Sequence, residues 1–205
     1  MLLGLALVLA ALDWVAVARR LPRLEYGCKP GAALAFLATA VVLDPLSNTA
    51  RVWFCVALAA CVAGDVLLMI PRDAFVAGLA AFVVAQVCFT VGFAHEDPIV
   101  TRLAVGVVLV GLLIVPLARR FVRSMRAQGA TALIAPVVAY IAVIAAMAVS
   151  AIAGGNAWGI VGALLFVASD SLIAENRFVA PRSWAPLAIM VTYHLALAGL
   201  VIGLV

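Results

Sequence analysis

Long apolar runs separated by short polar stretches recur along the whole chain. Each run approaches the length of about 20 residues that a helix needs to cross a bilayer. The pattern predicts eight such helices, at roughly residues 2–18, 30–43, 52–70, 75–94, 99–118, 130–153, 157–174 and 184–205. The second run is the shortest of the eight. The chain is therefore predicted to be a polytopic all-α helix bundle, with residues 1–205 forming one integral membrane domain.

The composition agrees with this fold class. Of the 205 residues, 68% are hydrophobic and 11% are charged, whereas a soluble domain is about half apolar and about a quarter charged. The net charge of +4 does not indicate nucleic-acid binding, because the basic residues lie in short connections between apolar runs. We expect a multi-pass protein of the cell (inner) membrane, with lipids as its surroundings and no nucleic acid as a partner.

Lysine and arginine are unequally divided between the two predicted sides of the membrane. The connections after the first, third, fifth and seventh runs hold eleven of the thirteen: Arg19, Arg20, Arg23, Lys29, Arg72, Arg119, Arg120, Arg123, Arg126, Arg177 and Arg182. Only Arg51 and Arg102 fall on the other side. Because cytoplasmic connections are enriched in basic residues, the pattern predicts that both termini lie on the non-cytoplasmic side. The four arginines between residues 119 and 126 are predicted to form a basic loop.

Three aspartates interrupt the predicted membrane helices: Asp13, Asp65 and Asp170. A charge at the centre of a spanning helix costs about 2.5–3.5 kcal/mol on insertion scales, so such residues usually face the bundle interior, a partner or water. Each aspartate comes five or six residues before polar residues or a proline, which places it roughly 8–9 Å inside the cytoplasmic end of its helix. We therefore expect a layer of carboxyls open to the cytoplasmic leaflet.

Asp65 and Asp170 stand in similar segments, Val-Ala-Gly-Asp-Val-Leu and Val-Ala-Ser-Asp-Ser-Leu. Apolar surroundings favour the neutral form of a carboxyl, and two neighbouring carboxyls resist losing both protons. A protonated acid beside an ionised base is the arrangement that cleaves acetal-like bonds. We predict Asp65 and Asp170 as catalytic residues of one site. The alternative is structural, with each carboxyl bonded to a neighbouring helix or to Lys29.

Five further polar residues are predicted to bind substrate: Lys29, Tyr193, His194, Gln86 and Asp13. Lys29 could neutralise a carboxylate or hold a lipid phosphate. The alternative for Gln86, as for Tyr140, is a hydrogen bond between helices. Asp13 could instead pair with arginines at the interface, and a lone histidine amid apolar residues is often structural.

Other kinds of site are not indicated by the sequence. The four cysteines, Cys28, Cys55, Cys61 and Cys88, show no Cys-x-x-Cys spacing and are interpreted as small buried side chains. The sequence contains no glycine-rich phosphate loop and no His-Glu-x-x-His motif, so we expect no cofactor and no metal. Ser169 does not stand in a Gly-x-Ser-x-Gly elbow, which argues against a serine hydrolase.

Several segments together resemble one family. They are Lys-Pro at 29–30, Gly-Asp-Val-Leu-Leu-Met at 64–69, Phe-Val-Ala-Gly-Leu-Ala-Ala-Phe at 75–82, the segment 162–171 and Thr-Tyr at 192–193. The chain is similar to the YhhN-like membrane proteins, which include the lysoplasmalogenases. The resemblance implies eight spans and hydrolysis of the vinyl ether bond of lysoplasmalogens, giving a fatty aldehyde and a glycerophospho-head group. It also implies Asp65 and Asp170 as the central acids, with Lys29 and Tyr193 nearby.

The chain departs from the family pattern in two helices. Gln86 and Phe89 stand where the family usually has histidine and tyrosine, and Leu197 stands where it usually has glutamine. Where the family usually has Tyr-Tyr, this chain has Tyr193 and His194. Two alternatives stay open beside the hydrolase. One is a lipid-binding or transport protein without hydrolase activity, and the other is a hydrolase of another lysolipid. The sequence assigns neither the acid and base roles nor an oligomeric state.

Overall fold

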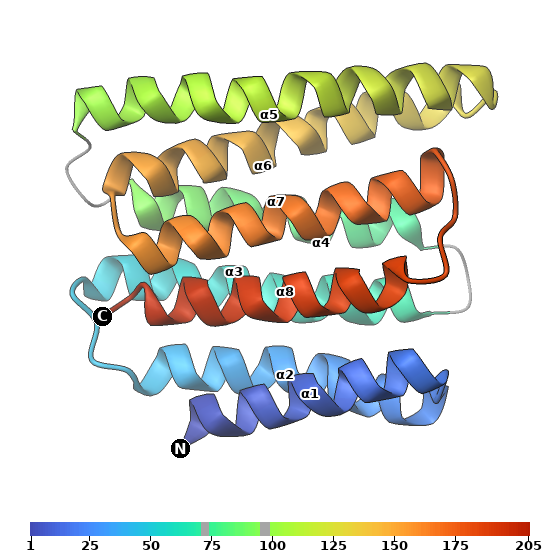
Figure 1. Cartoon of the computed structure of the whole chain (residues 1–205). Helices are drawn as coiled ribbons and strands as arrows, with labels where there is room; N and C mark the ends of the chain where they lie inside the picture. Colours follow the sequence, from blue (N-terminus) through green and yellow to red (C-terminus); the bar gives the residue numbers. More distant parts are fainter. Residues whose placement is uncertain (71–73, 95–98) are drawn as a thin grey trace.

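The computed structural model describes residues 1–70, 74–94 and 99–205, and these residues are helical throughout except at the connections (Figure 1). The described residues form the α-helices α1 (Leu2–Arg19), α2 (Pro22–Val42), α3 (Asn48–Met69), α4 (Phe75–Phe93), α5 (Val100–Ala127), α6 (Ile134–Gly154), α7 (Ala157–Phe178) and α8 (Ala185–Ile202), with a short 3₁₀ turn η1 (Thr131–Leu133) before α6. The predicted all-α class is confirmed. Arg72, counted above among the basic residues, lies outside the described residues.

The helices run up and down along a common direction, with both termini at the same end of the bundle (Figure 1). Helices α1 and α2 form one edge, α5 and α6 the other, and α3, α4, α7 and α8 lie between them. Helix α8 packs against α1, α2 and α7, while α6 contacts α4, α5 and α7. Helices that are distant in the sequence therefore enclose the centre of the bundle.

Seven helical segments of the described chain are long and apolar enough to cross a membrane, and α2 is not among them. Helix α2 begins at Pro22, eight residues before the predicted start of the second run. Proline fits the first turn of a helix, where no backbone donor is needed, so the helix starts there. Its N-terminal part carries Arg23, Glu25 and Lys29, and these charges keep its hydropathy below that of a membrane span.

The prediction that the fifth helix ends near residue 118 and is followed by a basic loop is wrong. Helix α5 continues to Ala127, so Arg119, Arg120, Arg123 and Arg126 lie on its last turns. Phe121 and Met125, one helical turn apart, are 2% and 0% exposed. Burial of this apolar stripe stabilises the extension while the arginines occupy the remaining faces.

Differences at other helix ends change the depths of the three aspartates. Helix α3 ends at Met69 and α7 continues to Phe178. Asp13, Asp65 and Asp170 therefore lie six, four and eight residues before the ends of their helices, or about 9, 6 and 12 Å. The prediction that the three aspartates lie at equal depth is wrong. Polar residues mark where an apolar run ends, but the helix can end earlier or later than the run.

Small residues allow α7 and α8 to meet backbone to backbone. A Cβ atom added to Gly162 would lie 2.6 Å from the Leu200 backbone nitrogen, and one added to Gly199 would lie 2.9 Å from the Gly162 Cα. Neither neighbour is a side chain that could rotate away. The close approach matters for the site, because Asp170 lies on α7 and Tyr193 on α8.

Gly162→Ala is expected to lower the free energy of unfolding by about 1–3 kcal/mol, because α7 and α8 must separate to admit the methyl group. Equilibrium unfolding in mixed micelles measures the change. Gly111→Ala is the matched control, since it also lies inside an apolar helix but has no atom within 4 Å of the added Cβ. Equal losses in the two variants would show that the contact between α7 and α8 is not tight.

Candidate functional site

Asp65 on α3 is held by two neighbouring helices. Lys29 Nζ, on α2, lies 3.5 Å from Asp65 Oδ1, and the Tyr193 hydroxyl, on α8, donates a hydrogen bond of 2.7 Å to Asp65 Oδ2. Asp65 is 1% exposed and Lys29 is 7% exposed. A charge buried in this way is tolerated when it is paired and hydrogen-bonded. Lys29 therefore neutralises a carboxylate, one of the two roles considered from the sequence.

Asp170 on α7 has a different partner. The Tyr140 hydroxyl, on α6, donates a hydrogen bond to Asp170 Oδ2. The prediction that Tyr140 bonds across helices is thereby confirmed. Asp170 has no ion pair within the described residues, and it is partly exposed where Asp65 is buried. The two acids thus differ in the charge of their partners.

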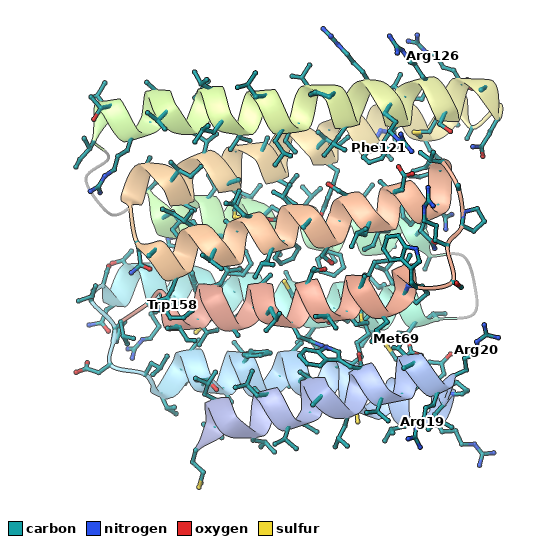
Figure 2. The ribbon with its side chains drawn as sticks, viewed as in Figure 1. Arg19, Arg20, Met69, Phe121, Arg126 and Trp158 are labelled. Atoms are coloured by element: carbon teal, nitrogen blue, oxygen red, sulfur yellow. The ribbon has the colours of Figure 1, made fainter. Side chains whose placement is uncertain are left out.

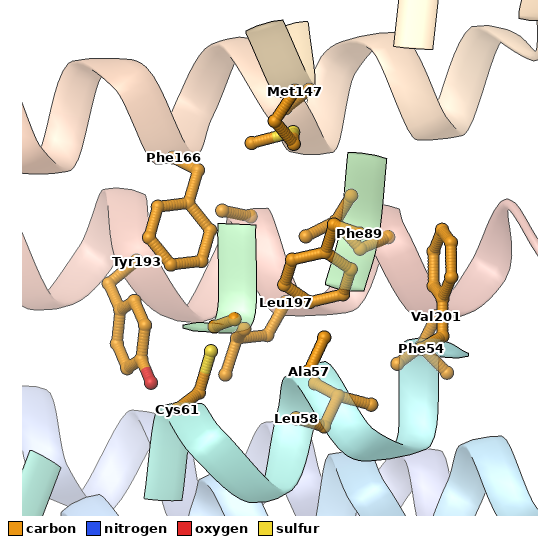
Figure 3. Close-up of a cluster of buried hydrophobic side chains, with 14 of the residues drawn as sticks. Phe54, Ala57, Leu58, Cys61, Phe89, Met147, Phe166, Tyr193, Leu197 and Val201 are labelled. Atoms are coloured by element: carbon orange, nitrogen blue, oxygen red, sulfur yellow. The ribbon is translucent and has the colours of Figure 1, made fainter. Parts of the chain in front are cut away.

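The two carboxyls are close enough to interact electrostatically. The Cys61 thiol lies within electrostatic reach of both Asp65 and Asp170 and beside the Tyr193 hydroxyl. Figure 3 shows the Tyr193 hydroxyl pointing toward Cys61 on α3, with Phe166 beside the tyrosine ring. Cys61 is 0% exposed, in agreement with its interpretation as a small buried side chain. The fold brings the two predicted catalytic residues to one region of the core.

An apolar cavity reaches Asp170 from between α3, α4, α5, α6 and α7. Its volume is about 60 Å³, enough for a few water molecules or part of an alkyl chain. Its polar lining includes Asp170, Tyr140 and Ser171, and its apolar walls include Phe82, Ile114 and Ile144. Asp65 does not line this cavity. The sequence predicted one chamber for both acids, and this prediction is wrong because only Asp170 lines the cavity.

Asp13 and His194 are two further buried polar residues near Lys29. The Trp14 indole N–H donates to His194 Nδ1 at 3.0 Å, so the neutral imidazole carries its proton on Nε2. That nitrogen and both carboxylate oxygens of Asp13 are buried and have no hydrogen-bond partner among the described residues. Asp13 and His194 each lie within electrostatic reach of Lys29. The predicted pairing of Asp13 with interfacial arginines does not occur in the described contacts.

Gln86 lies near the Tyr140 hydroxyl and is 0% exposed. Within the described part of the chain, its amide forms no hydrogen bond of normal geometry. It therefore stands close to the Asp170 side of the site, while His194 and Asp13 stand on the Lys29 side. The residues predicted to bind substrate are thus divided between two flanks of the acid pair.

Three residues of this arrangement were not predicted as site residues from the sequence: Tyr140, Trp14 and Cys61. Tyr140 was noted as an isolated polar residue in an apolar run, a signal that could have marked it as a partner of an acid. Trp14 and Cys61 carry no comparable signal, because both are common in apolar helices. No group of three or more histidine, cysteine, aspartate or glutamate side chains able to hold a metal ion occurs in residues 1–70, 74–94 and 99–205.

Comparison with known proteins places these residues in a wider context. The model of the YhhN family matches residues 24–204. A protein of Mycobacterium tuberculosis named lysoplasmalogenase is 34% identical over 150 residues, which cover 70% of this chain and 56% of the relative. The lysoplasmalogenase of Mycobacterium bovis matches to the same extent. The human protein named lysoplasmalogenase TMEM86B is 33% identical over 140 residues, covering 68% of this chain and 58% of the relative.

The chain spans less than three-fifths of the length of these curated relatives. The family match begins at residue 24, so it excludes α1 and with it Asp13 and Trp14. No solved structure matches the chain. Both acids, Lys29, Tyr140 and Tyr193 lie within the matched segment.

Proposed function

The chain belongs to the YhhN family, and from this membership and its acid pair we propose that it is a membrane hydrolase of lysoplasmalogens. The proposed reaction cleaves the vinyl ether bond and releases a fatty aldehyde and a glycerophospho-head group. The relatives named lysoplasmalogenase support the choice of substrate. The observation that carries the proposal is Asp170, a carboxyl on the wall of an apolar cavity with Asp65 within electrostatic reach.

The different partners of the two carboxyls suggest different roles. Lys29 and the Tyr193 hydroxyl both favour an ionised Asp65. Asp170, which has an apolar cavity before it, is suited to carry a proton. We assign the general acid to Asp170 because it can contact a molecule in the cavity, and we assign charge stabilisation to Asp65.

In the proposed reaction, Asp170 first transfers its proton to the vinyl carbon that is farther from the ether oxygen. The double-bond electrons form the new C–H bond, and the other vinyl carbon becomes part of an oxocarbenium ion. Negative charge on Asp65, which is within electrostatic reach of Asp170, stabilises this cation. Water adds to the cationic carbon and returns a proton to Asp170, and the resulting hemiacetal collapses to aldehyde and alcohol. One water is consumed for each bond broken.

We place the substrate site toward the cytoplasmic leaflet, with both termini on the opposite side of the cell membrane. Figure 2 shows Arg19, Arg20 and Arg126 at one end of the bundle and Trp158 at the other, and the arginine-rich end is the one expected to face the cytoplasm. In this orientation the cavity at Asp170 lies nearer to the cytoplasmic end. Lys29, Tyr193, His194, Gln86 and Asp13 are proposed to surround the substrate or the attacking water.

The purified protein is expected to release a fatty aldehyde from a lysolipid with a vinyl ether chain. It should release nothing from the saturated alkyl ether lysolipid with the same chain length and head group, because that chain has no double bond to protonate. An ester lysolipid completes the panel. Mass spectrometry of the products measures each reaction over the same time course.

Release of fatty acid from the ester lysolipid without aldehyde would make the protein a hydrolase of another lysolipid. The absence of any product, combined with movement of lysolipid across vesicle membranes, would instead support the transport alternative. Either result would contradict the proposed chemistry. The alkyl ether lipid serves as the matched control because it differs from the substrate only in the bond that reacts.

A further inference from the structure

A hollow lies at the arginine-rich end of the bundle, between α1, α2 and the start of α8. Its volume is about 660 Å³, and three of its lining side chains are polar: Arg20, Glu25 and Ser183. Since a water molecule takes up about 30 Å³ in the liquid, the hollow has room for many. None of the described residues lines both the hollow and the cavity at Asp170, which is enclosed by α3 to α7. The two spaces therefore lie between different helices.

Each helix around the hollow carries a buried polar residue deeper in the bundle. On each, this residue is four or seven positions from one that lines the hollow, spacings that share a helix face. Helix α1 runs toward the arginine-rich end, and α2 and α8 run away from it (Figure 1), so the polar residues lie about 6–10 Å below the hollow along the helix axes. The pairs are Val17 and Asp13 on α1, Glu25 and Lys29 on α2, and Leu187 and His194 on α8.

Asp13 connects the hollow with the acid pair. Its side chain is 0% exposed. It lies within electrostatic reach of Glu25 on the wall of the hollow, and also of Lys29 and Asp65 in the core. Neither of its carboxylate oxygens has a hydrogen-bond partner among the described residues. Buried polar groups are nearly always hydrogen-bonded to protein or to ordered water, so water is the partner that suits these oxygens.

His194 offers a donor where Asp13 offers acceptors. The Trp14 indole donates to His194 Nδ1, which leaves the Nε2–H group as a donor that no described residue accepts. Lys29, an ammonium with three donors, is within electrostatic reach of both Asp13 and His194. A buried water molecule typically makes about three hydrogen bonds. It can accept from His194 and from Lys29 and donate to Asp13.

We infer that Asp13 and His194 bind the water consumed in the reaction, and that this water enters from the hollow between α1, α2 and α8. The inference rests on the proposed function for the step that uses water. Lipid and water then reach the acid pair by separate routes, because the hydrocarbon chain occupies the cavity at Asp170. Trp14 is a positioning residue, since its indole fixes the tautomer of the imidazole.

Hydroxyl-radical labelling tests for this water without any turnover. X-rays convert bound water into radicals that oxidise adjacent side chains, and mass spectrometry of the peptides measures the oxidation. In nanodiscs, His194 is expected to be oxidised although it is 0% exposed, whereas Phe54, packed between other phenylalanines and 2% exposed, should not be. On α1, Val17 lines the hollow and should be oxidised. Val15 is exposed on the outer face of the same helix, where lipid covers it, and should not be.

Substitutions of Asp13 identify the group that holds the water. Asp13→Leu has a similar volume but no oxygen, so oxidation of His194 is expected to fall to the level of Phe54. Asp13→Asn keeps a side-chain oxygen and should preserve the oxidation. Asp44→Leu is the matched control, because it removes an exposed carboxylate at the opposite end of the bundle. It should leave the labelling unchanged.

Three results would overturn the inference. The first is oxidation of His194 in the unmodified protein no greater than that of Phe54, a comparison that depends on no variant. The second is unchanged oxidation of His194 in Asp13→Leu, and the third is equal oxidation of Val15 and Val17. A failure of the proposed function alone would appear as absence of aldehyde from a protein whose labelling is as expected.

Discussion

Asp170→Asn is expected to lower the rate of aldehyde release by about a thousandfold or more, because it removes the proton that begins cleavage of the vinyl ether. General acid catalysis typically contributes about 10²–10⁴-fold, and the described residues that line the apolar cavity include no other acidic side chain. Asparagine keeps a side-chain oxygen that can accept the hydrogen bond from Tyr140, so the fold should persist. Aldehyde release by the purified variant, beside its circular dichroism and gel-filtration profile, measures both effects.

Asp44→Asn is a suitable control for this substitution. Asp44 is exposed in the connection between α2 and α3, at the opposite end of the bundle from Arg126. The same chemical change there should leave the rate unaltered. If folded Asp170→Asn retained more than about a tenth of the original activity, Asp170 could not be the acid.

Lys29→Met is expected to lower the free energy of unfolding by about 3–5 kcal/mol, the effect of leaving one partner of a buried ion pair uncompensated. Lys29 and Asp65 are 3.5 Å apart, with side chains 9% and 2% exposed. The substitution keeps the hydrocarbon stem but leaves Asp65 with the Tyr193 hydroxyl as its remaining hydrogen-bonding partner in the described structure. Equilibrium unfolding in mixed micelles provides the measurement.

The double variant Lys29→Met with Asp65→Asn should recover part of that loss, since no charge of the pair is then left buried. Recovery is incomplete because Asp13 also lies within electrostatic reach of Lys29. Arg23→Met, an exposed position on the same helix, should change stability by no more than about 0.5 kcal/mol. Additive losses in the double variant would mean that Lys29 and Asp65 do not stabilise each other.

The division of the polar residues into two flanks suggests how one site can handle both a lipid chain and water. The Asp170 flank is largely apolar and carries the cavity. The Lys29 flank includes Asp13 and His194, whose buried polar atoms have no partner among the described residues. Buried polar groups of this kind are commonly satisfied by ordered water. The cavity is therefore suited to hydrocarbon, while water can satisfy the buried polar atoms of Asp13, His194 and Gln86.

Much of the fold could be predicted from the sequence, because a run of consecutive apolar residues indicates a membrane helix. Every predicted run overlaps an observed helix. The errors concern helix ends, as in α5, where Phe121 and Met125 keep an arginine-rich segment helical by packing inward. That stabilisation comes from contacts with neighbouring helices, which the hydropathy of the segment itself does not include.

The site was predictable only in part. A carboxyl within an apolar run is conspicuous, so Asp13, Asp65 and Asp170 could be singled out from the sequence. The separation of Asp65 from the cavity could not be predicted, since it depends on how far α3 is rotated about its axis. The same holds for Trp14, which meets His194 from a position 180 residues earlier in the chain.

The sequence by itself determined the helical class of this protein and the positions of its buried acids, because hydrophobicity and charge belong to each residue wherever it lies. Only the tertiary structure decided which acid is paired with lysine and which lines the cavity. Tyr193 and Asp65 are 128 residues apart, and Tyr140 and Asp170 are 30 apart. Such pairs depend on the rotation and neighbours of whole helices, which the sequence of one segment does not contain.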